Sequence, residues 1–239
     1  MHATIQKKMD VILTYLRPEE KVFVVGCGNC ADKCKSGGPE ETEEMAQRLK
    51  KKGVNVIGYS STPVGVGLCS LPMCRKMIKE EKVDETNLAD SFLVLACGQG
   101  IHTVIDATDG GAVHPGCDTI FGGETEQPGI VKEYCSLCGE CVTAYTAGLC
   151  PMTLCSKMLL NGPCGGAKDG KCEVDKDKDC GWHLIYARLK EAGKLHLLEA
   201  YYEPKNHAKW SRPRSLTVKG SEATFKSLAG EHTVSREDL

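Results

Sequence analysis

Fifteen cysteines among 239 residues are the side chains of this sequence best suited to chemistry. Three of them, Cys135, Cys138 and Cys141, are each separated by two residues. Such short gaps let one tight loop present three thiolates to three irons of a cubic iron–sulfur cluster. This spacing favours an iron–sulfur cluster at the triplet. Because all-thiolate tetrahedral sites also accept zinc, a zinc site is the alternative.

Five more cysteines follow the triplet and raise the local total to eight, the ligand count of two four-cysteine sites. These five are Cys150, Cys155, Cys164, Cys172 and Cys180. Cys150 precedes a proline, like the cysteine that closes ferredoxin motifs. We expect Cys180 to complete the triplet and the other four to form a second site. In the zinc alternative, the region is a knuckle without an electron-transfer role.

A third group of thiols lies near the N-terminus, where Cys27, Cys30 and Cys34 directly follow a predicted strand. Cys97 follows another predicted strand. Ligands of an open parallel sheet lie beyond the carboxyl ends of its strands. These four thiols are therefore expected to converge on a further cluster.

The first of these loops has a competing interpretation, because residues 26–31 read Gly-Cys-Gly-Asn-Cys-Ala and fit the dinucleotide-binding pattern G-x-G-x-x-A. Two features count against a nucleotide. Residues 36–39, Ser-Gly-Gly-Pro, interrupt the helix that should receive the pyrophosphate. The second predicted strand ends in Tyr59 and Ser60, where a ribose-binding acid is wanted. The sequence therefore favours metal at this loop.

The remaining cysteines carry a weaker signal. Buried cysteine often serves as a small hydrophobic residue, which is the role we expect for Cys117. Cys69 and Cys74, with four residues between them, fit that role and a ligand role equally well. Nucleophilic catalysis is not expected, because His102 and His114 lack an evident orienting carboxylate in the sequence.

The elements that must position these thiols alternate between strand and helix, which predicts an α/β fold with a small doubly wound parallel sheet. An amphipathic helix is predicted over Thr4–Leu16. The further predicted strands are Lys21–Val25, Val54–Tyr59 and Ser91–Ala96, and the helices are Pro39–Lys52, Leu71–Glu81 and Ile101–Ala107.

Three domains are expected along the chain. Residues 1–125 form the α/β domain, and a linker at Gly122–Gly129 ends it. Residues 126–193 form a cysteine-rich domain that metal must organise, with one helix at Trp182–Leu189. Residues 194–239 form an extended tail that either wraps its own domain or docks on a partner.

Composition bounds the partners and the compartment. The 30 basic and 32 acidic residues are spread along the chain, so no single-sign field attracts nucleic acid. No secretory signal and no apolar run of about 20 residues is present, so neither export nor membrane insertion is expected. In the cytoplasm thiols stay reduced, and abundant cysteine there points to metal or redox chemistry.

Two motifs give the sequence a family resemblance. Residues 161–166, Asn-Gly-Pro-Cys-Gly-Gly, are followed by Gly-Lys-Cys-Glu-Val at 170–174. Together with Leu149-Cys150-Pro151-Met152 and Cys180-Gly181-Trp182, they closely resemble the C-terminal cysteine-rich domain associated with methylenetetrahydrofolate reductase. The first domain, with Cys27 and Cys97 each followed by glycine, resembles the small MetV-type subunit of the acetogen enzyme. The resemblance covers roughly residues 22–189.

The resemblance implies an accessory subunit without catalytic residues of its own. Two or three [4Fe-4S] clusters, with zinc in place of one of them as an alternative, would feed a separate flavin-containing catalytic subunit. That partner would reduce methylenetetrahydrofolate in the Wood–Ljungdahl pathway of anaerobes, and further electron-transfer subunits are compatible with this arrangement. One competing hypothesis is a zinc-stabilised scaffold of the same complex. A weaker one is an independent enzyme that handles corrinoid or methyl groups.

Overall fold

The computed structural model describes residues 1–127 and 129–216, which divide into two compact units. The first is Met1–Phe121 and the second is Gly122–Leu216. Of the expected tail, residues 217–239 lie outside the described residues. Among the described helices, none combines the length and the apolar composition needed to cross a bilayer.

The first unit is built on a parallel sheet of four strands in the order β3-β2-β4-β5. The strands are β2 (Val22–Gly26), β3 (Val56–Ser61), β4 (Ser91–Leu95) and β5 (Ala112–Pro115). Every residue of β2 and β4 is buried, as strands covered on both faces require. The predicted α/β class with a parallel sheet is confirmed.

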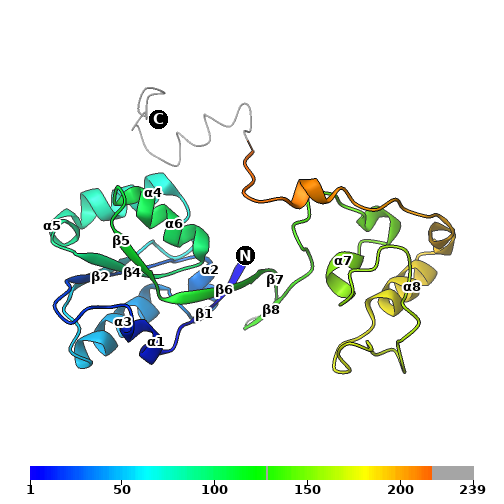
Figure 1. Ribbon diagram of the computed structural model, residues 1–239, viewed down its shortest axis with the longest axis horizontal. Coiled ribbons are helices and arrows are strands. Elements are labelled where there is room, and N and C mark those ends of the chain that lie inside the picture. The colour runs from blue at the N-terminus through cyan, green and yellow to red at the C-terminus, as the bar shows by residue number, and fades with distance from the viewer. Residues whose placement is uncertain (128, 217–239) are drawn as a thin grey trace. The chain divides into compact units, whose positions relative to one another are not determined.

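Helices cover both faces of this sheet (Figure 1). They are α1 (Met9–Leu13), α2 (Cys30–Lys33), α3 (Pro39–Lys51), α4 (Leu71–Arg75), the π-helix η1 (Lys76–Glu81), α5 (Val83–Asn87) and α6 (Gly98–Ala107). Alternate residues of β2 point to opposite faces. Val22 and Val24 pack with Met45 of α3, whereas Phe23 and Val25 pack in the other apolar cluster, with α4 and α6.

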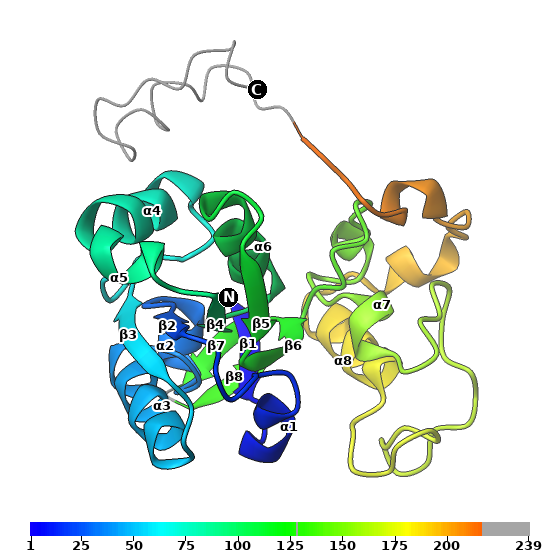
Figure 2. The same ribbon diagram turned by 60° about the vertical axis from the view of Figure 1, so that its left-hand side comes forward.

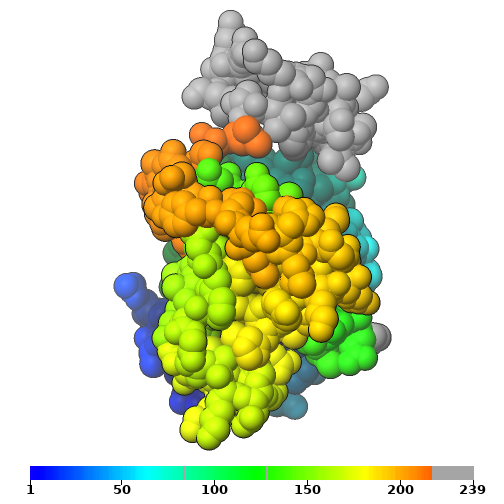
Figure 3. Space-filling view, turned by 90° about the vertical axis from the view of Figure 1, so that its right-hand side faces the viewer, coloured from blue at the N-terminus to red at the C-terminus, as the bar shows by residue number. Residues whose placement is uncertain are grey.

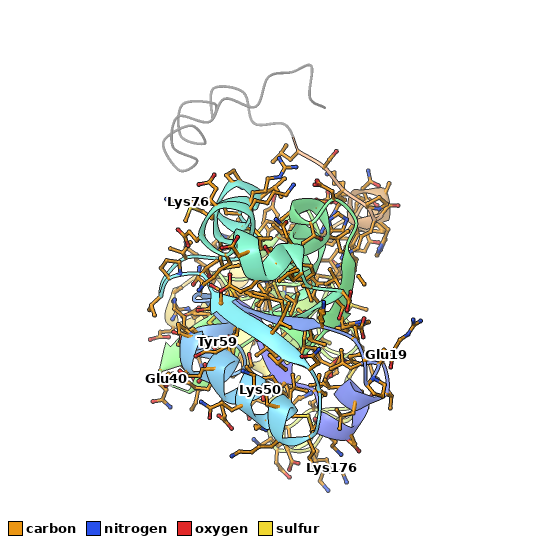
Figure 4. All side chains as sticks on the ribbon, turned by 90° about the vertical axis from the view of Figure 1, so that its left-hand side faces the viewer. Glu19, Glu40, Lys50, Tyr59, Lys76 and Lys176 are labelled. Atoms are coloured by element: carbon orange, nitrogen blue, oxygen red, sulfur yellow. The ribbon has the colours of Figure 1, made fainter. Side chains whose placement is uncertain are left out.

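Helix α3 shows how the sequence sets an element's limits. Pro39 is its first residue, and the Gly38 amide donates a hydrogen bond of 2.9 Å to the Glu41 carboxylate. Figure 4 shows Glu40 and Lys50 near opposite ends of this helix, where acid at the first turn and base at the last match the helix dipole. In the same view, Tyr59 lies on the edge strand β3, where its side chain is exposed.

The N-terminal prediction was wrong. Instead of one helix over Thr4–Leu16, the chain forms β1 (His2–Gln6) followed by the short α1. Strand β1 pairs with β6 (Cys117–Gly122), and the Lys7 amide donates to the Gly116 carbonyl at 2.9 Å. Pairing with a strand distant in sequence has overridden a locally helical pattern.

The expected linker at Gly122–Gly129 begins at the boundary between the two units, but it is not irregular throughout. This segment enters an antiparallel hairpin of β7 (Glu124–Gln127) and β8 (Ile130–Lys132), which opens the second unit. The residues of β7 and β8 do not alternate between polar and apolar types, so the sequence pattern did not predict these strands.

The second unit has little regular structure and one small apolar cluster. Its elements after the hairpin are η2 (Thr143–Tyr145), α7 (Pro151–Leu154), α8 (Gly181–Glu191), η3 (Leu195–Glu199) and η4 (His207–Trp210). Helix α8, predicted over Trp182–Leu189, is confirmed, and it lies beside α7 (Figure 2). Trp182, Ile185 and Leu189 are buried on it, and the Trp182 indole donates to the Leu159 carbonyl at 3.0 Å.

The described part of the expected tail wraps its own unit. The Tyr202 ring stacks on Tyr145 with centroids 4.3 Å apart, and Asn161 makes two hydrogen bonds of 2.8 Å with the Tyr202 backbone. Figure 3 shows this orange segment lying across yellow-green parts of the same unit. Residues 194–216 therefore help to fix the loops that carry the cysteines.

Candidate metal centres

The edge of the sheet where β2 and β4 end brings Cys27 and Cys97 to neighbouring positions. Strand β2 ends at Gly26, which pairs with Leu95 of β4, so the two cysteines follow adjacent parallel strands. Both are buried. Cys30 is the first residue of α2, one helical turn after Cys27. These three predicted ligands share one edge of the sheet.

The loop after β3 lies against the same edge and carries Cys69. The Leu68 amide donates to Cys27 Sγ at 3.4 Å, and the Gly65 amide donates to the Gly28 carbonyl at 2.6 Å. Burial raises the pKa of the Cys69 thiol, and nearby Cys97, Cys27 and Cys30 raise it further because adjacent negative charges repel. Sequence spacing alone had left Cys69 undecided.

Cys34 faces a different part of the first unit. Its thiol points to the His2 carbonyl of β1 at 3.9 Å. Cys34 interacts electrostatically with Cys117. Burial raises the pKa of Cys117 to about 12, and its thiol donates to the Ser36 carbonyl at 3.3 Å. Cys117 belongs to the apolar cluster on the α3 face, whereas Cys27 belongs to the cluster on the other face. The described contacts of Cys34 therefore lie away from Cys27, Cys30 and Cys97, with which the spacing had grouped it.

Cys74 and Cys117 are both buried in apolar clusters of the first unit. Cys74 is fully buried in the apolar cluster, and burial raises its pKa to about 12. A thiol held in its neutral form in an apolar core acts as a small hydrophobic residue. This is the role expected for Cys117, and the structure extends it to Cys74.

The backbone geometry disfavours the nucleotide alternative. A pyrophosphate would need the Gly28 amide, but this amide donates to Thr62 Oγ1 at 2.8 Å. A Cβ atom at Gly28 would lie 2.3 Å from the Pro63 carbonyl oxygen, so the loop after β3 already occupies the approach. Helix α2 has only four residues.

Both histidines have carboxylate neighbours, contrary to the expectation from sequence. His102 Nδ1 lies 3.2 Å from Asp106 Oδ2, and His114 Nε2 lies 3.7 Å from Glu20 Oε1. His102 and Asp106 are one helical turn apart, a signal that sequence spacing contained. Among the described residues, neither histidine forms a hydrogen bond or ion pair with a cysteine, so these contacts give no pair of nucleophile and base.

In the second unit, the triplet sits in a loop with two left-handed residues, Leu137 (φ 54°) and Gly139 (φ 82°). The Leu137 amide donates to Cys135 Sγ at 3.4 Å, and Cys141 Sγ lies 3.2 Å from Thr143 Oγ1. Lys205 Nζ lies 2.9 Å from Cys138 Sγ and also donates to the Glu140 carbonyl. Local polar groups thus surround all three sulfurs.

These polar groups favour the ionised thiols. Burial alone raises the pKa of Cys138, but hydrogen bonds from Lys205 and the Glu140 backbone outweigh it, and the pKa falls below its ordinary value. Hydrogen bonds to Thr143 lower the pKa of Cys141. Metals bind the thiolate, so the lowered pKa values of Cys138 and Cys141 favour metal coordination by these two sulfurs. Lys205 is 67 residues from Cys138 in the chain, and no sequence pattern predicted that the two would be in contact.

The other C-terminal thiols gather around one small cavity. Its lining includes Cys155, Cys164, Cys172 and Cys180, with Trp182 beside them. This arrangement favours a different partition from the expected one, which assigned Cys180 to the triplet. The α8 cluster buries Cys180 next to the cavity.

The loops of this cavity have the backbone that a wrapped metal site needs. Gly162, Gly165 and Gly170 all have positive φ values, of 111°, 81° and 78°. The Gly166 amide donates to Cys164 Sγ at 3.4 Å. A hydrogen bond from the Val174 backbone lowers the pKa of Cys172, and Ser156 adds to this effect. Cys150 caps α7, and its sulfur accepts from Thr153 Oγ1 at 3.6 Å.

Within residues 1–127 and 129–216, no three Cys, His, Asp or Glu side chains converge closely enough to hold an ion without adjustment. The donor set nevertheless fits a thiophilic metal. All fifteen cysteines are free thiols, eight lie in a unit with one small apolar cluster, and sulfur-directed amides line their loops. Metal binding would supply the folding free energy that this unit's core does not.

Comparison with known proteins identifies the cysteine-rich region. Residues 114–208 match the family described as "Methylene-tetrahydrofolate reductase C terminal". The match includes all eight C-terminal cysteines and Lys205. No curated protein and no solved structure matches the chain. Residues 114–208 are therefore similar to the C-terminal domain of methylenetetrahydrofolate reductase, which supports a chain associated with that enzyme.

Proposed function

We propose that this chain is the iron–sulfur electron-transfer subunit of a methylenetetrahydrofolate reductase complex. It would pass electrons to a flavin-containing catalytic partner that reduces methylenetetrahydrofolate to methyltetrahydrofolate. The observation that carries the proposal is the presence of nine free thiols within the matched region, eight of them in the second unit and four of these around one cavity.

The cavity suggests how these thiols divide. Cys155, Cys164, Cys172 and Cys180 form one set of four, and the triplet together with Cys150 forms the other. Cys150 is followed by Pro151 and caps a helix, which agrees with the cysteine-proline that closes ferredoxin motifs. Each set has the four thiolates that a [4Fe-4S] cluster requires.

The protein's own contribution is to hold and tune the thiolates. Lys205, Thr143 and Ser156 each provide a polar contact to a cysteine sulfur, at 2.9, 3.2 and 3.6 Å. Backbone amides of Leu137 and Gly166 also point at sulfurs. Bound clusters would supply one-electron transfer, and hydrogen bonds to their sulfurs set their potentials.

The division of labour follows from the chemistry of the proposed partner. A flavin accepts single electrons and delivers a hydride equivalent, so it can join one-electron clusters to a two-electron folate reduction. Fifteen free thiols are compatible with a reducing compartment, and we assign the complex to the cytoplasm of an anaerobe.

Metal analysis of the full chain, purified without oxygen, tests the proposal. We expect about eight to twelve irons per chain with equal sulfide, corresponding to two or three [4Fe-4S] clusters. Dithionite should bleach the visible absorbance and produce an electron paramagnetic resonance signal. Zinc at every site without sulfide would refute electron transfer and leave the alternative, a zinc-stabilised scaffold of the same complex.

A second measurement tests the partnership. The loaded chain should transfer electrons from dithionite to the flavin of the catalytic subunit, and stripped chain should not. Flavin reduction at the same rate with stripped chain would exclude the clusters from the electron path.

A further inference from the structure

An exposed thiol at the edge of the first unit has no role in the function described above. Cys69 lies in the loop between β3 and α4, and its side chain is exposed, whereas Cys27 and Cys97 are buried. The question is whether this thiol belongs with the predicted ligands or is incidental.

Sheet topology places Cys69 with them. In the order β3-β2-β4, Cys69 follows β3, Cys27 follows β2 and Cys97 follows β4, so three adjacent parallel strands each lead into a cysteine-bearing loop. The chain runs from β2 outward to β3 and then back across to β4. The carboxyl edge between β2 and β4 is therefore the switch point of the sheet, where ligands of such folds bind.

Hydrogen bonds fix the Cys69 loop against the Cys27 loop. Thr62 Oγ1 accepts from the Gly28 amide and donates to the Val66 carbonyl at 2.6 Å. The Leu68 amide, adjacent to Cys69 in the chain, donates to Cys27 Sγ at 3.4 Å. An added Cβ at Gly67 would lie 3.2 Å from Cys69 Sγ and 3.7 Å from the Asn29 amide nitrogen, so the two loops are in close contact here.

Cys97, Cys27 and Cys30 all lie close enough to Cys69 to interact with it electrostatically. Four thiolates gathered in this way are stabilised by a shared cation, because the metal's positive charge offsets their mutual repulsion. Cys34 does not share this environment, because its thiol faces β1 and Cys117.

We propose that Cys27, Cys30, Cys69 and Cys97 are the four ligands of a thiolate-bound metal centre in the first unit, with Cys69 in the position that spacing had assigned to Cys34. The centre deepens the proposed function by adding a third cluster, of the [4Fe-4S] type. Because Cys69 is exposed, the centre lies at the surface of its unit, where electrons can enter or leave.

Two matched substitutions in the full chain test this ligand set. Cys69→Ser and Cys34→Ser each remove one thiol that is not fully buried, so both variants are expected to fold. After anaerobic purification, Cys69→Ser should lose about four irons and four sulfides per chain, and Cys34→Ser should retain the wild-type content. Loss in Cys34→Ser with retention in Cys69→Ser, or retention in both, would overturn the proposal.

Alkylation mapping gives a second readout that does not depend on variant folding. In the wild-type chain, Cys69 should be protected from iodoacetamide while metal is bound and modified after chelation. Modification of Cys69 at equal rates in both states would contradict its role as a ligand.

The outcomes separate this inference from the proposed function. Clusters that persist in the second unit while Cys69→Ser changes nothing would refute the ligand set and leave electron transfer standing. Zinc in place of iron, lost from Cys69→Ser only, would support the ligand set and refute the redox role of this centre.

Discussion

Replacing Lys205 with methionine removes the ammonium group that lies 2.9 Å from Cys138 Sγ, while keeping most of the side chain's apolar length. We expect this change to weaken metal binding at the triplet without unfolding the second unit. The remaining contacts of the C-terminal segment, including the stacking of Tyr202 on Tyr145, do not involve Lys205.

The distance sets the expected magnitude. Two unit charges at this separation attract by about 1.4 kcal/mol in a medium as polar as water, which is about tenfold in an equilibrium constant. Loss of a hydrogen bond to a metal ligand typically weakens metal affinity by about 10-fold to 100-fold. The Coulomb value is thus the lower bound, and we expect iron to be released at least about tenfold more readily. For a one-electron couple, the same energy corresponds to a fall in reduction potential of about 60 mV.

Competition with an iron chelator on anaerobic chain measures the first effect, and a redox titration followed by electron paramagnetic resonance measures the second. Lys205→Arg keeps the charge and should preserve most of the wild-type behaviour. Lys209→Met is the matched control, since Lys209 pairs with Glu140 at 3.4 Å and contacts no described sulfur. Equal iron release in Lys205→Met and wild type would refute the reasoning, as would an equal loss in Lys209→Met.

Three further predictions concern stability. Cys138→Ser should lose one cluster and lower the melting temperature of the second unit, because the free energy of metal binding there contributes to folding. An unchanged iron content and an unchanged calorimetric transition would argue against Cys138 as a ligand. Trp182→Ala should destabilise the second unit by about 3 to 5 kcal/mol, because it empties a buried site beside the four-thiol cavity, and a loss below about 1 kcal/mol in urea unfolding would contradict this. Cys117→Ala should reduce the loss of stability at alkaline pH. The raised pKa of Cys117 favours its neutral form, so its contribution to the free energy of unfolding is complete below pH 9 and is lost as pH rises toward about 12. The prediction is contradicted if the unfolding free energies of variant and wild type fall in parallel over that range.

The central strands were accessible from sequence because their signal is local. Strands β2 and β4 are continuous apolar runs buried on both faces, and each is followed by a glycine or cysteine turn. Strand β1 was not accessible, because its partner β6 lies more than a hundred residues away and its own residues also fit a helix. The hydrophobic pattern of a segment predicts which of its residues are buried, but it does not identify the distant segment that buries them.

The same distinction governs the candidate sites. The triplet spacing is local, and the structure keeps its three cysteines in one loop with left-handed turns at Leu137 and Gly139. The positions of Cys69 and Lys205 depend on contacts across 40 residues or more, so spacing gave no reason to prefer Cys69 over Cys34. Spacing alone assigned Cys180 to the triplet, because the sequence does not show that α8 packs beside the cavity lined by Cys164 and Cys172.

The two units hold their thiols by different physical means, and this difference bears on what each centre can do. In the first unit, Cys27 and Cys97 extend from β2 and β4, whose burial by helices on both faces does not depend on metal. Metal there would be added to a scaffold that is already rigid, which would favour reversible electron transfer with little rearrangement. In the second unit, the loops between Cys155 and Cys180 contain only two isolated bridges, around Lys171, and rest on one short helix. Metal bound there would also provide structure, so under the proposed function loss of a cluster would remove both a redox centre and the surface that the second unit presents to a partner.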